Sequence, residues 1–307
     1  MNILITGGTG FVGQALCAAL ALRGHQLTVL SRQGQDALAL LPEGSSVVTS
    51  LGDIAKDQHF DAVINLAGEG IADRRWTESR KQALQDSRIG LTAELAALVA
   101  RLDNKPGLLI NGSAVGFYGD AGDAELDENS PAVRKDFTYL LCDAWEKAAR
   151  QIGRQGVRVC LLRIGVVLDA DGGMLKRLVP MYRVGLGAQL GDGSQWMSWI
   201  HRHDLVRLIL RLLDTPGVEG VYNAVAPQPV THRRFHQALA SACRRPALLR
   251  VPAVTLRLLL GEMSTLLLGG QRALPRRLMQ EGFEFRYPDI RQALEACVQR
   301  QQDTPES

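Results

Sequence analysis

The chain lacks the features that mark nucleic-acid-binding and disulfide-rich proteins. Its 307 residues carry a net charge of only +3, which is too small to indicate nucleic acid as a partner. It has five cysteines, an odd number without a C-x-x-C pair, so we expect no disulfide framework and a reducing compartment. The proportions of apolar residues (46%) and charged residues (22%) are typical of an ordinary soluble globular protein.

Long hydrophobic runs are also scarce. The most apolar late stretch, residues 254–268, is interrupted by Arg257 and Glu262 and is too short to span a bilayer. The N-terminus enters a strand directly, which leaves no room for a signal peptide. Residues 231–307 hold twelve arginines against seven acids, but the arginines are dispersed, which favours a solvated face. We therefore expect a cytoplasmic protein with neither a membrane nor a nucleic acid as its partner.

The most informative segment is the first thirteen residues. Residues 2–5 are a short, β-branched, apolar run typical of a buried strand, and apolar residues recur at helical spacing after residue 11. Glycines in a G-x-x-G-x-x-G pattern lie between them. Such a turn aims backbone N–H groups and the positive end of a helix dipole at one point, which suits a pyrophosphate; a purely structural turn is the alternative. The predicted dinucleotide contacts are Gly7, Thr9, Gly10, Phe11, Val12 and Gly13.

The end of the second predicted strand, residues 26–30, bears on the choice of cofactor. Proteins that bind NAD usually place an acid here to hold the ribose 2′-hydroxyl. This chain has Ser31 and Arg32 instead. An arginine pairs with the extra phosphate of NADP, so the sequence predicts NADP, with a solvent-facing arginine as the alternative.

Further short apolar runs, separated mostly by helical patterns, predict an α/β protein with a doubly wound parallel sheet, the Rossmann arrangement. The expected strands are residues 2–5, 26–30, 47–49, 61–66, 108–110 and 157–162. A loop is expected at residues 33–45, and helices are expected at 75–102 and 136–150.

Small residues follow the fourth strand at the edge where such sheets bind ligands. In addition, Arg88 interrupts the apolar side of a helix that should border this cleft, although it could equally be a surface arginine. These positions predict further cofactor contacts from Leu66, Ala67, Gly68 and Arg88.

The pattern changes after about residue 170, where glycine and proline become frequent. We predict an NADP-binding domain over residues 1–168. Residues 169–300 are expected to form a smaller, mostly helical domain, laid over the carboxyl edge of the sheet to hold the substrate. Residues 220–224 have the pattern of a strand, so the prediction allows part of this segment to return to the sheet. Residues 301–307 are expected to be frayed.

Together these segments resemble the extended short-chain dehydrogenase/reductase superfamily, which includes the NAD-dependent epimerases and dehydratases. The shared features are the T-G-G-x-G-F-x-G opening, an N-x-A-G fourth strand end, a serine near a Y-G pair after strand five, and an arginine ending strand six. A narrower resemblance, to the subfamily called epimerase family protein with its own C-terminal extension, covers nearly the whole chain. It rests on residues 65–69, 75–77, 87–88, 165–168, 199–201, 223–227, 260–262, 270–272, 275 and 282–288. The resemblance implies NADP(H) binding in the cytoplasm.

The catalytic pattern departs from that superfamily, which uses a tyrosine with a lysine four residues later and a nearby serine or threonine. Aligning Glu146 with the glutamate that follows the lysine places Thr138 and Cys142 where the tyrosine and lysine belong. Tyr139 is followed four residues on by Asp143, whose charge opposes ionisation of a phenol. The usual dyad is therefore absent.

Other donors remain near the expected nicotinamide position. Ser113 matches the serine of the superfamily, with a structural role in the loop after strand five as the alternative. Tyr118 could reach the same space or pack internally. Arg163, followed by Ile164 at the end of strand six, is assigned to the cofactor site, although an arginine that links the sheet end to a loop is equally consistent. His201 and His203 have no third ligand at suitable spacing, so no metal site is predicted.

Three interpretations follow. The first is an NADP-dependent oxidoreductase or epimerase that acts on a small polar substrate, for which a nucleotide sugar is one candidate. The second is a non-catalytic protein that senses NADP(H), as the missing dyad suggests. The third is a partner-binding protein that docks through its tail. A homodimer is a candidate assembly. Fold does not choose among these functions, because the superfamily carries many chemistries.

Overall fold

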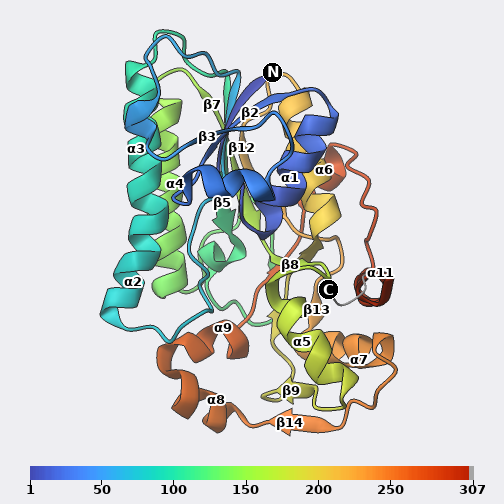
Figure 1. The fold of residues 1–307 in the computed structure, drawn as a ribbon. Coiled ribbons are helices and arrows are strands. Elements are labelled where there is room, and N and C mark those ends of the chain that lie inside the picture. The colour runs from blue at the N-terminus through green and yellow to red at the C-terminus, as the bar shows by residue number, and fades with distance from the viewer. Residues whose placement is uncertain (304–307) are drawn as a thin grey trace.

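The computed structural model describes residues 1–303 and places a seven-stranded sheet at the centre of the upper part of the molecule (Figure 1). Its strand order is β12-β7-β5-β4-β1-β2-β3, and every neighbouring pair is parallel. The strands are β1 (Asn2–Thr6), β2 (Gln26–Leu30), β3 (Ser46–Val48), β4 (Ala62–Asn65), β5 (Leu108–Ala114), β7 (Arg158–Ile164) and β12 (Gly220–Ala224).

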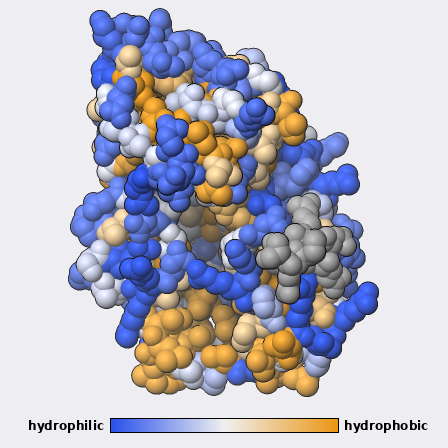
Figure 2. Space-filling model, viewed as in Figure 1, coloured by the Kyte–Doolittle hydropathy of each residue, from blue (hydrophilic) through white to orange (hydrophobic). Residues whose placement is uncertain are grey.

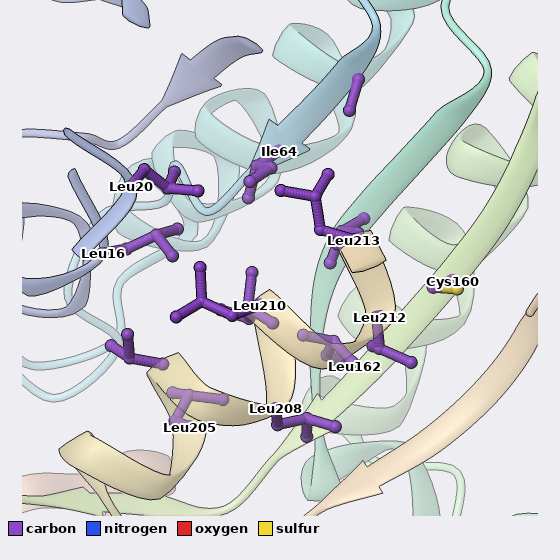
Figure 3. Close-up of a cluster of buried hydrophobic side chains, with 14 of the residues drawn as sticks. Leu16, Leu20, Ile64, Cys160, Leu162, Leu205, Leu208, Leu210, Leu212 and Leu213 are labelled. Atoms are coloured by element: carbon purple, nitrogen blue, oxygen red, sulfur yellow. The ribbon is translucent and has the colours of Figure 1, made fainter. Parts of the chain in front are cut away.

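Helices cover both faces of this sheet. On one face α1 (Phe11–Leu22) and α6 (Arg202–Asp214) pack against alternate strand residues such as Ile3 and Ile64. Figure 3 shows leucines of α6 beside Leu16 and Leu20 of α1. On the other face α3 (Leu91–Arg101) and α4 (Phe137–Gly153) cover Leu4 and its alternating neighbours. Strands buried on both faces are apolar throughout, which explains their unbroken hydrophobic sequences and confirms the predicted doubly wound sheet.

Two helix starts have clear local causes. The Asp136 carboxylate accepts the backbone N–H groups of Thr138 and Tyr139 at 3.0 and 3.1 Å, so it caps α4 at the position expected for its start. Thr231 likewise caps α7 (His232–Ala242) through the N–H of Arg234. The predicted loop at 33–45 differs: it contains the 3₁₀ helix η1 (Gly34–Leu40), which buries Ala37.

The long helix expected over residues 75–102 is three consecutive pieces. It comprises α2 (Glu78–Gln85), a π-helical turn η3 (Asp86–Gly90) and α3. Such π turns are rare and occur frequently at functional sites. This one carries Arg88 on the side of the chain that faces Gly68.

A smaller lobe lies below the sheet, on the side where β7 continues into β8 (Val166–Leu168) (Figure 1). Its apolar core, centred on Trp199 and Phe235, is separate from the two clusters that sandwich the sheet. The principal elements of the lobe are α5 (Gly173–Arg183), β9 (Ala188–Leu190), α7, β14 (Leu249–Val251), α8 (Ala253–Leu260), α9 (Thr265–Leu268) and α11 (Ile290–Asp303).

The remaining elements are short. They are η2 (Leu51–Asp53), η4 (Val115–Tyr118), β6 (Glu125–Leu126), β10 (Trp196–Met197), β11 (Trp199–His201), β13 (Val230–Thr231), η5 (Gly261–Ser264), β15 (Arg272–Ala273) and α10 (Arg276–Gln280). The pairing of β15 with β6 ties the C-terminal segment to the loop after β5.

The chain does not divide between the two parts at a single position. Both α6 and β12 follow residue 168 yet belong to the sheet and its core. The return of residues 220–224 to the sheet was allowed for in the prediction. Residues 301–303 continue α11, whereas residues 304–307 of the expected frayed tail lie outside the described residues.

Candidate functional site

The glycine turn is packed so tightly that side chains do not fit at two of its positions. Gly7 has φ 73°, and a Cβ there would lie 2.7 Å from the backbone of Leu66 and Ala67. A Cβ on Gly13 would lie 2.0 Å from the Gly7 carbonyl oxygen. The turn therefore sits against the end of β4, beside the start of α1. No side chain caps α1, whose N-cap residue is Gly10, so the cradle suits the phosphates of a dinucleotide.

Buried polar side chains join the carboxyl ends of three neighbouring strands. The Thr6 hydroxyl donates to Asn65 Oδ1 at 2.5 Å, and Asn65 Nδ2 donates to Asn111 Oδ1 at 2.6 Å. The same amide donates to Thr92 Oγ1, which also accepts from Trp145. This network fixes the sheet edge under the glycine turn. Sequence reasoning missed Thr6, Thr92 and Asn111, although polar residues ending apolar strands were an available signal.

The residues that end β2 differ in exposure. Ser31 is buried, and its hydroxyl accepts the backbone N–H of Gln33 at 3.2 Å. The Arg32 side chain is 90% exposed, and its Nη1 lies 3.9 Å from the Glu69 carboxylate. Its guanidinium is therefore free of tight internal contacts and can turn toward an added anion.

Arg88 is held against the backbone rather than directed into solvent. Its guanidinium donates to the Glu69 carbonyl oxygen at 2.9 Å and lies close against Gly68. It also lies 5.3 Å from the Trp145 ring. Burial lowers the pKa of Arg88, and the neighbouring positive charge of Arg80 adds to this effect. Arg88 is therefore not a solvent-facing arginine, and its contact with the cofactor stays a prediction.

An ion pair that the sequence did not predict completes this cluster. Arg80 pairs with the Glu69 carboxylate and donates to the Gly70 carbonyl oxygen at 2.7 Å. Arg32, Arg80 and Arg88 thus surround one acid, which leaves an excess of positive charge beside the glycine turn. The sequence feature that could have indicated this ion pair is the position of Glu69 directly after Gly68.

The Ser113 side chain is buried in the interior. It is 3% exposed, and its hydroxyl donates to Glu146 Oε1 at 2.9 Å. Glu146, on α4, is itself fully buried and also binds Arg163. The serine hydroxyl is therefore committed to a buried carboxylate, which favours its structural alternative.

Tyr118 is not available to a substrate in this structure. It is fully buried, and its hydroxyl lies 2.7 Å from Asn223 Oδ1 and 2.8 Å from the Asp127 carbonyl oxygen. Burial raises the pKa of Tyr118 to about 12, although Arg163 opposes the increase. The hydroxyl is bound to internal acceptors, as the packing alternative expects, and the catalytic role of Tyr118 stays a prediction.

The Arg163 side chain is likewise used within the protein. Its guanidinium forms two hydrogen bonds to Glu146, at 2.9 and 3.1 Å, and a third to the Tyr118 hydroxyl at 3.0 Å. It also stacks on Phe117, 3.5 Å from the ring centre. These contacts match the alternative of an arginine that links the sheet end to a loop, and the cofactor assignment of its side chain stays a prediction. Ile164, the last residue of β7, is half-buried.

The two dyad positions hold groups that do not ionise readily. The Thr138 hydroxyl donates to the Asp136 carboxylate at 2.6 Å. Cys142 is buried beside Ser113 and Trp145, and burial together with the charge of Glu146 raises the pKa of its thiol to about 12. Neither position supplies a base near neutral pH.

Because the Cys142 thiol is buried and its pKa is raised, we predict that it reacts slowly with an alkylating reagent. At pH 8 only about one in ten thousand such thiols is ionised, and the thiolate is the reactive form. We expect iodoacetamide to label half-buried Cys243 at least ~100-fold faster than Cys142 in the folded protein, with equal labelling after unfolding. Mass spectrometry of timed digests measures both rates. Fast labelling of Cys142 in the folded protein would instead show that its thiol is accessible and ionises readily enough to act as a base.

His201 and His203 lie at the start of α6. His201 is buried, and its Nδ1 accepts the backbone N–H of His203, so it caps α6. Asp204 accepts the backbone N–H groups of Arg286 and Tyr287, both at 2.8 Å, and anchors the tail. Within residues 1–303 no group of three metal-ligating side chains occurs. None of the helices in that range is long and apolar enough to cross a bilayer.

The glycine turn also contacts the small lobe. A Cβ on Gly172, at the start of α5, would lie 2.2 Å from the Phe11 ring, and Arg202 lies 4.8 Å from the same ring. Figure 2 shows a hollow between the sheet and this lobe. On the other side the Gly270 N–H donates to Asp120, and Arg272 pairs with Glu125. The C-terminal segment therefore forms part of the wall between the two parts.

The sequence matches two family models and is similar to several known proteins. Residues 3–224 match the model of the NAD dependent epimerase/dehydratase family, and residues 251–297 match a domain of unknown function, DUF1731. The chain is 37% identical to the epimerase family protein YfhF of Bacillus subtilis, covering 97% of this chain and 98% of that protein. It is 42% identical to the epimerase family protein Mb2239 of Mycobacterium bovis, covering 95% and 96% respectively.

Solved structures give the same result. The crystal structure of human epimerase family protein SDR39U1 (isoform 2) with NADPH superposes with a TM-score of 0.87 at 32% identity, covering 97% of this chain and 99% of that one. UDP-glucose 4-epimerase of Thermotoga maritima superposes with a TM-score of 0.80 at 16% identity, which shows a shared fold alone.

Proposed function

Because the chain belongs to the NAD-dependent epimerase/dehydratase family, as its sequence motifs indicated, we propose that it is an NADP(H)-binding oxidoreductase or epimerase-like protein. Its substrate would be small and polar, with a nucleotide sugar as one candidate. The observation that carries the proposal is the glycine turn, in which Gly7 and Gly13 leave no space for side chains beside an uncapped helix start. The human relative crystallised with NADPH supports the choice of cofactor.

The residues around the turn have separate roles in this proposal. The backbone of residues 7–13 would hold the pyrophosphate, while Ser31 and Arg32 would hold the phosphate on the adenosine ribose. Ala67 and Gly68 would allow close approach at the end of β4, and the nearby arginines would offset the negative charge. When bound, NADP supplies a hydride acceptor or donor; the protein supplies position and electrostatics. None of the five cysteines forms a disulfide bond, which supports a reducing, cytoplasmic setting.

A specific observation favours a second candidate, a non-catalytic protein that senses NADP(H). Thr138 and Cys142 replace the usual dyad, and the hydroxyl groups of Ser113 and Tyr118 are both bound internally. A protein of this kind would bind the cofactor without transferring hydride.

A substrate screen separates the two candidates. Purified protein would be titrated with NADPH and then mixed with a panel of carbonyl and hydroxyl compounds while NADPH absorbance is followed. Catalysis predicts turnover that falls at least ~10-fold in Ser113→Ala, with NADPH affinity unchanged. Tight NADPH binding without turnover across the panel would favour the sensor. Failure to bind NADPH at all would refute both candidates.

Cofactor choice gives a sharper prediction. Arg32→Ala should weaken NADPH binding about 10- to 100-fold, because a charge-assisted hydrogen bond contributes about 1.5–3 kcal/mol. NADH should be nearly unaffected, since it lacks the extra phosphate. Fluorescence titration of both cofactors measures the difference, with Arg154→Ala, at an exposed arginine directly after α4, as the control. Equal losses for NADPH and NADH would show that Arg32 does not contact the phosphate.

A further inference from the structure

The far end of the small lobe exposes many large aliphatic side chains, a surface we call the apolar tip (Figure 2). They come from the end of α5, from β14 and from α8, and β14 pairs with β9 in the same region. The residues are Met181, Val184, Leu186, Leu248, Leu249, Val254, Leu258 and Leu259. Leu248 is 80% exposed and Leu258 is 74% exposed, so both side chains lie at the surface and are not part of the apolar core. Exposed apolar patches of this kind mark interaction surfaces.

The charged residues of the two segments that form the apolar tip are all cations, although Arg177 pairs with Asp73 and acids (Asp171, Asp192 and Glu262) flank the segments. The segments are residues 172–191 and 244–261, and neither contains an acid. Together they carry seven cations: Lys176, Arg177, Arg183, Arg244, Arg245, Arg250 and Arg257. Arg245 donates to the Arg183 carbonyl oxygen at 2.6 Å, which shows that the two segments are adjacent. Arg244, Arg250 and Arg257 are exposed, and none forms an ion pair with another described residue. The fold therefore gathers arginines that are dispersed in the sequence.

We propose that the apolar tip binds the surface of an anionic lipid bilayer. Aliphatic side chains ringed by arginine suit the boundary between acyl chains and negatively charged headgroups, where the protein lies on the membrane without spanning it. A second copy of the chain fits less well, because a two-fold contact would bring the same cations together. The exposed apolar residues include no tryptophan, tyrosine or phenylalanine, the aromatic side chains that dominate binding energy between proteins.

This binding would hold the cleft near the membrane. α8 leads directly into η5, where Glu262 pairs with Lys81 of α2 at 2.6 Å. The same C-terminal segment then reaches the loop after β5 through Gly270 and Arg272. The proposal does not depend on cofactor binding, and it revises the expectation that no membrane acts as a partner.

Vesicle co-sedimentation of the full chain tests the proposal. We expect binding to vesicles of phosphatidylcholine mixed with phosphatidylglycerol, at least ~10-fold weaker binding to phosphatidylcholine alone, and release from the anionic vesicles by high salt. Arg250→Ala and Arg257→Ala should each lower partitioning about fivefold. Leu258→Ser and Leu259→Ser should each lower it about tenfold or more.

Matched controls lie at the opposite edge of the sheet. Leu22→Ser changes an equally exposed leucine at the end of α1, and Arg154→Ala changes an exposed arginine; both should leave partitioning unchanged. Thermal unfolding checks that every variant is folded. Absence of binding to anionic vesicles, or equal binding to neutral ones, would overturn the proposal. So would a dimer in light scattering that dissociates in Leu258→Ser, which would assign the tip to a second copy.

Discussion

Gly13→Ala is expected to abolish NADPH binding, with a loss of affinity of at least ~100-fold. The new Cβ would lie 2.0 Å from the Gly7 carbonyl oxygen and 2.7 Å from Gly8 Cα. Both are backbone atoms, so neither can rotate away as a flexible side chain does. The Gly7 carbonyl also accepts the Gly10 N–H at 3.0 Å, so displacing it opens the turn itself. Calorimetric titration with NADPH measures the loss.

A second helical glycine provides the matched control. Gly90, in η3, has no neighbouring atom within 4 Å of an added Cβ and no positive φ. Gly90→Ala should therefore retain NADPH affinity and leave stability unchanged or raised by about 0.5–1 kcal/mol, since alanine favours a helix. Normal NADPH binding by Gly13→Ala would show that the turn is not the phosphate site.

Arg163→Ala should lower the free energy of unfolding by about 3–5 kcal/mol, because it leaves the Glu146 carboxylate buried without its partner. The Arg163 side chain is 4% exposed and that of Glu146 is fully buried. The same substitution also removes a hydrogen bond to the Tyr118 hydroxyl and the stacking on Phe117. Urea unfolding of the protein without cofactor measures the change.

Two further variants test whether the loss of stability comes from an unpaired buried charge. Lys147→Ala breaks a solvent-exposed ion pair with Asp143 on the same helix and should leave the free energy of unfolding almost unchanged. Replacing Glu146 and Arg163 together with apolar residues should recover much of the loss, since no unpaired charge remains. If Arg163→Ala left stability intact and lost only NADPH affinity, the cofactor role predicted from the sequence would be right.

The sequence by itself determined the sheet, the glycine turn and the family. Residues 2–5, the helical spacing after Phe11 and the Asp136 cap are all local patterns, and local backbone preferences act within a few residues of the chain. The six predicted strands were therefore found in order. The glycines that the turn requires were found because a tight turn restricts the residue types that can occupy it.

Only the tertiary structure decided what the polar side chains do. Ser113 binds Glu146, which is 33 positions away, and Tyr118 contacts Asn223, which is 105 positions away. The return of β12 to the sheet and the gathering of arginines at the apolar tip depend on similarly distant segments. A spacing shows which strand carries a side chain, but the direction and partner of that side chain depend on the elements packed against it. For this reason the residues of the cofactor cradle could be read from the sequence, whereas the partners of Ser113, Tyr118 and Arg163 could not.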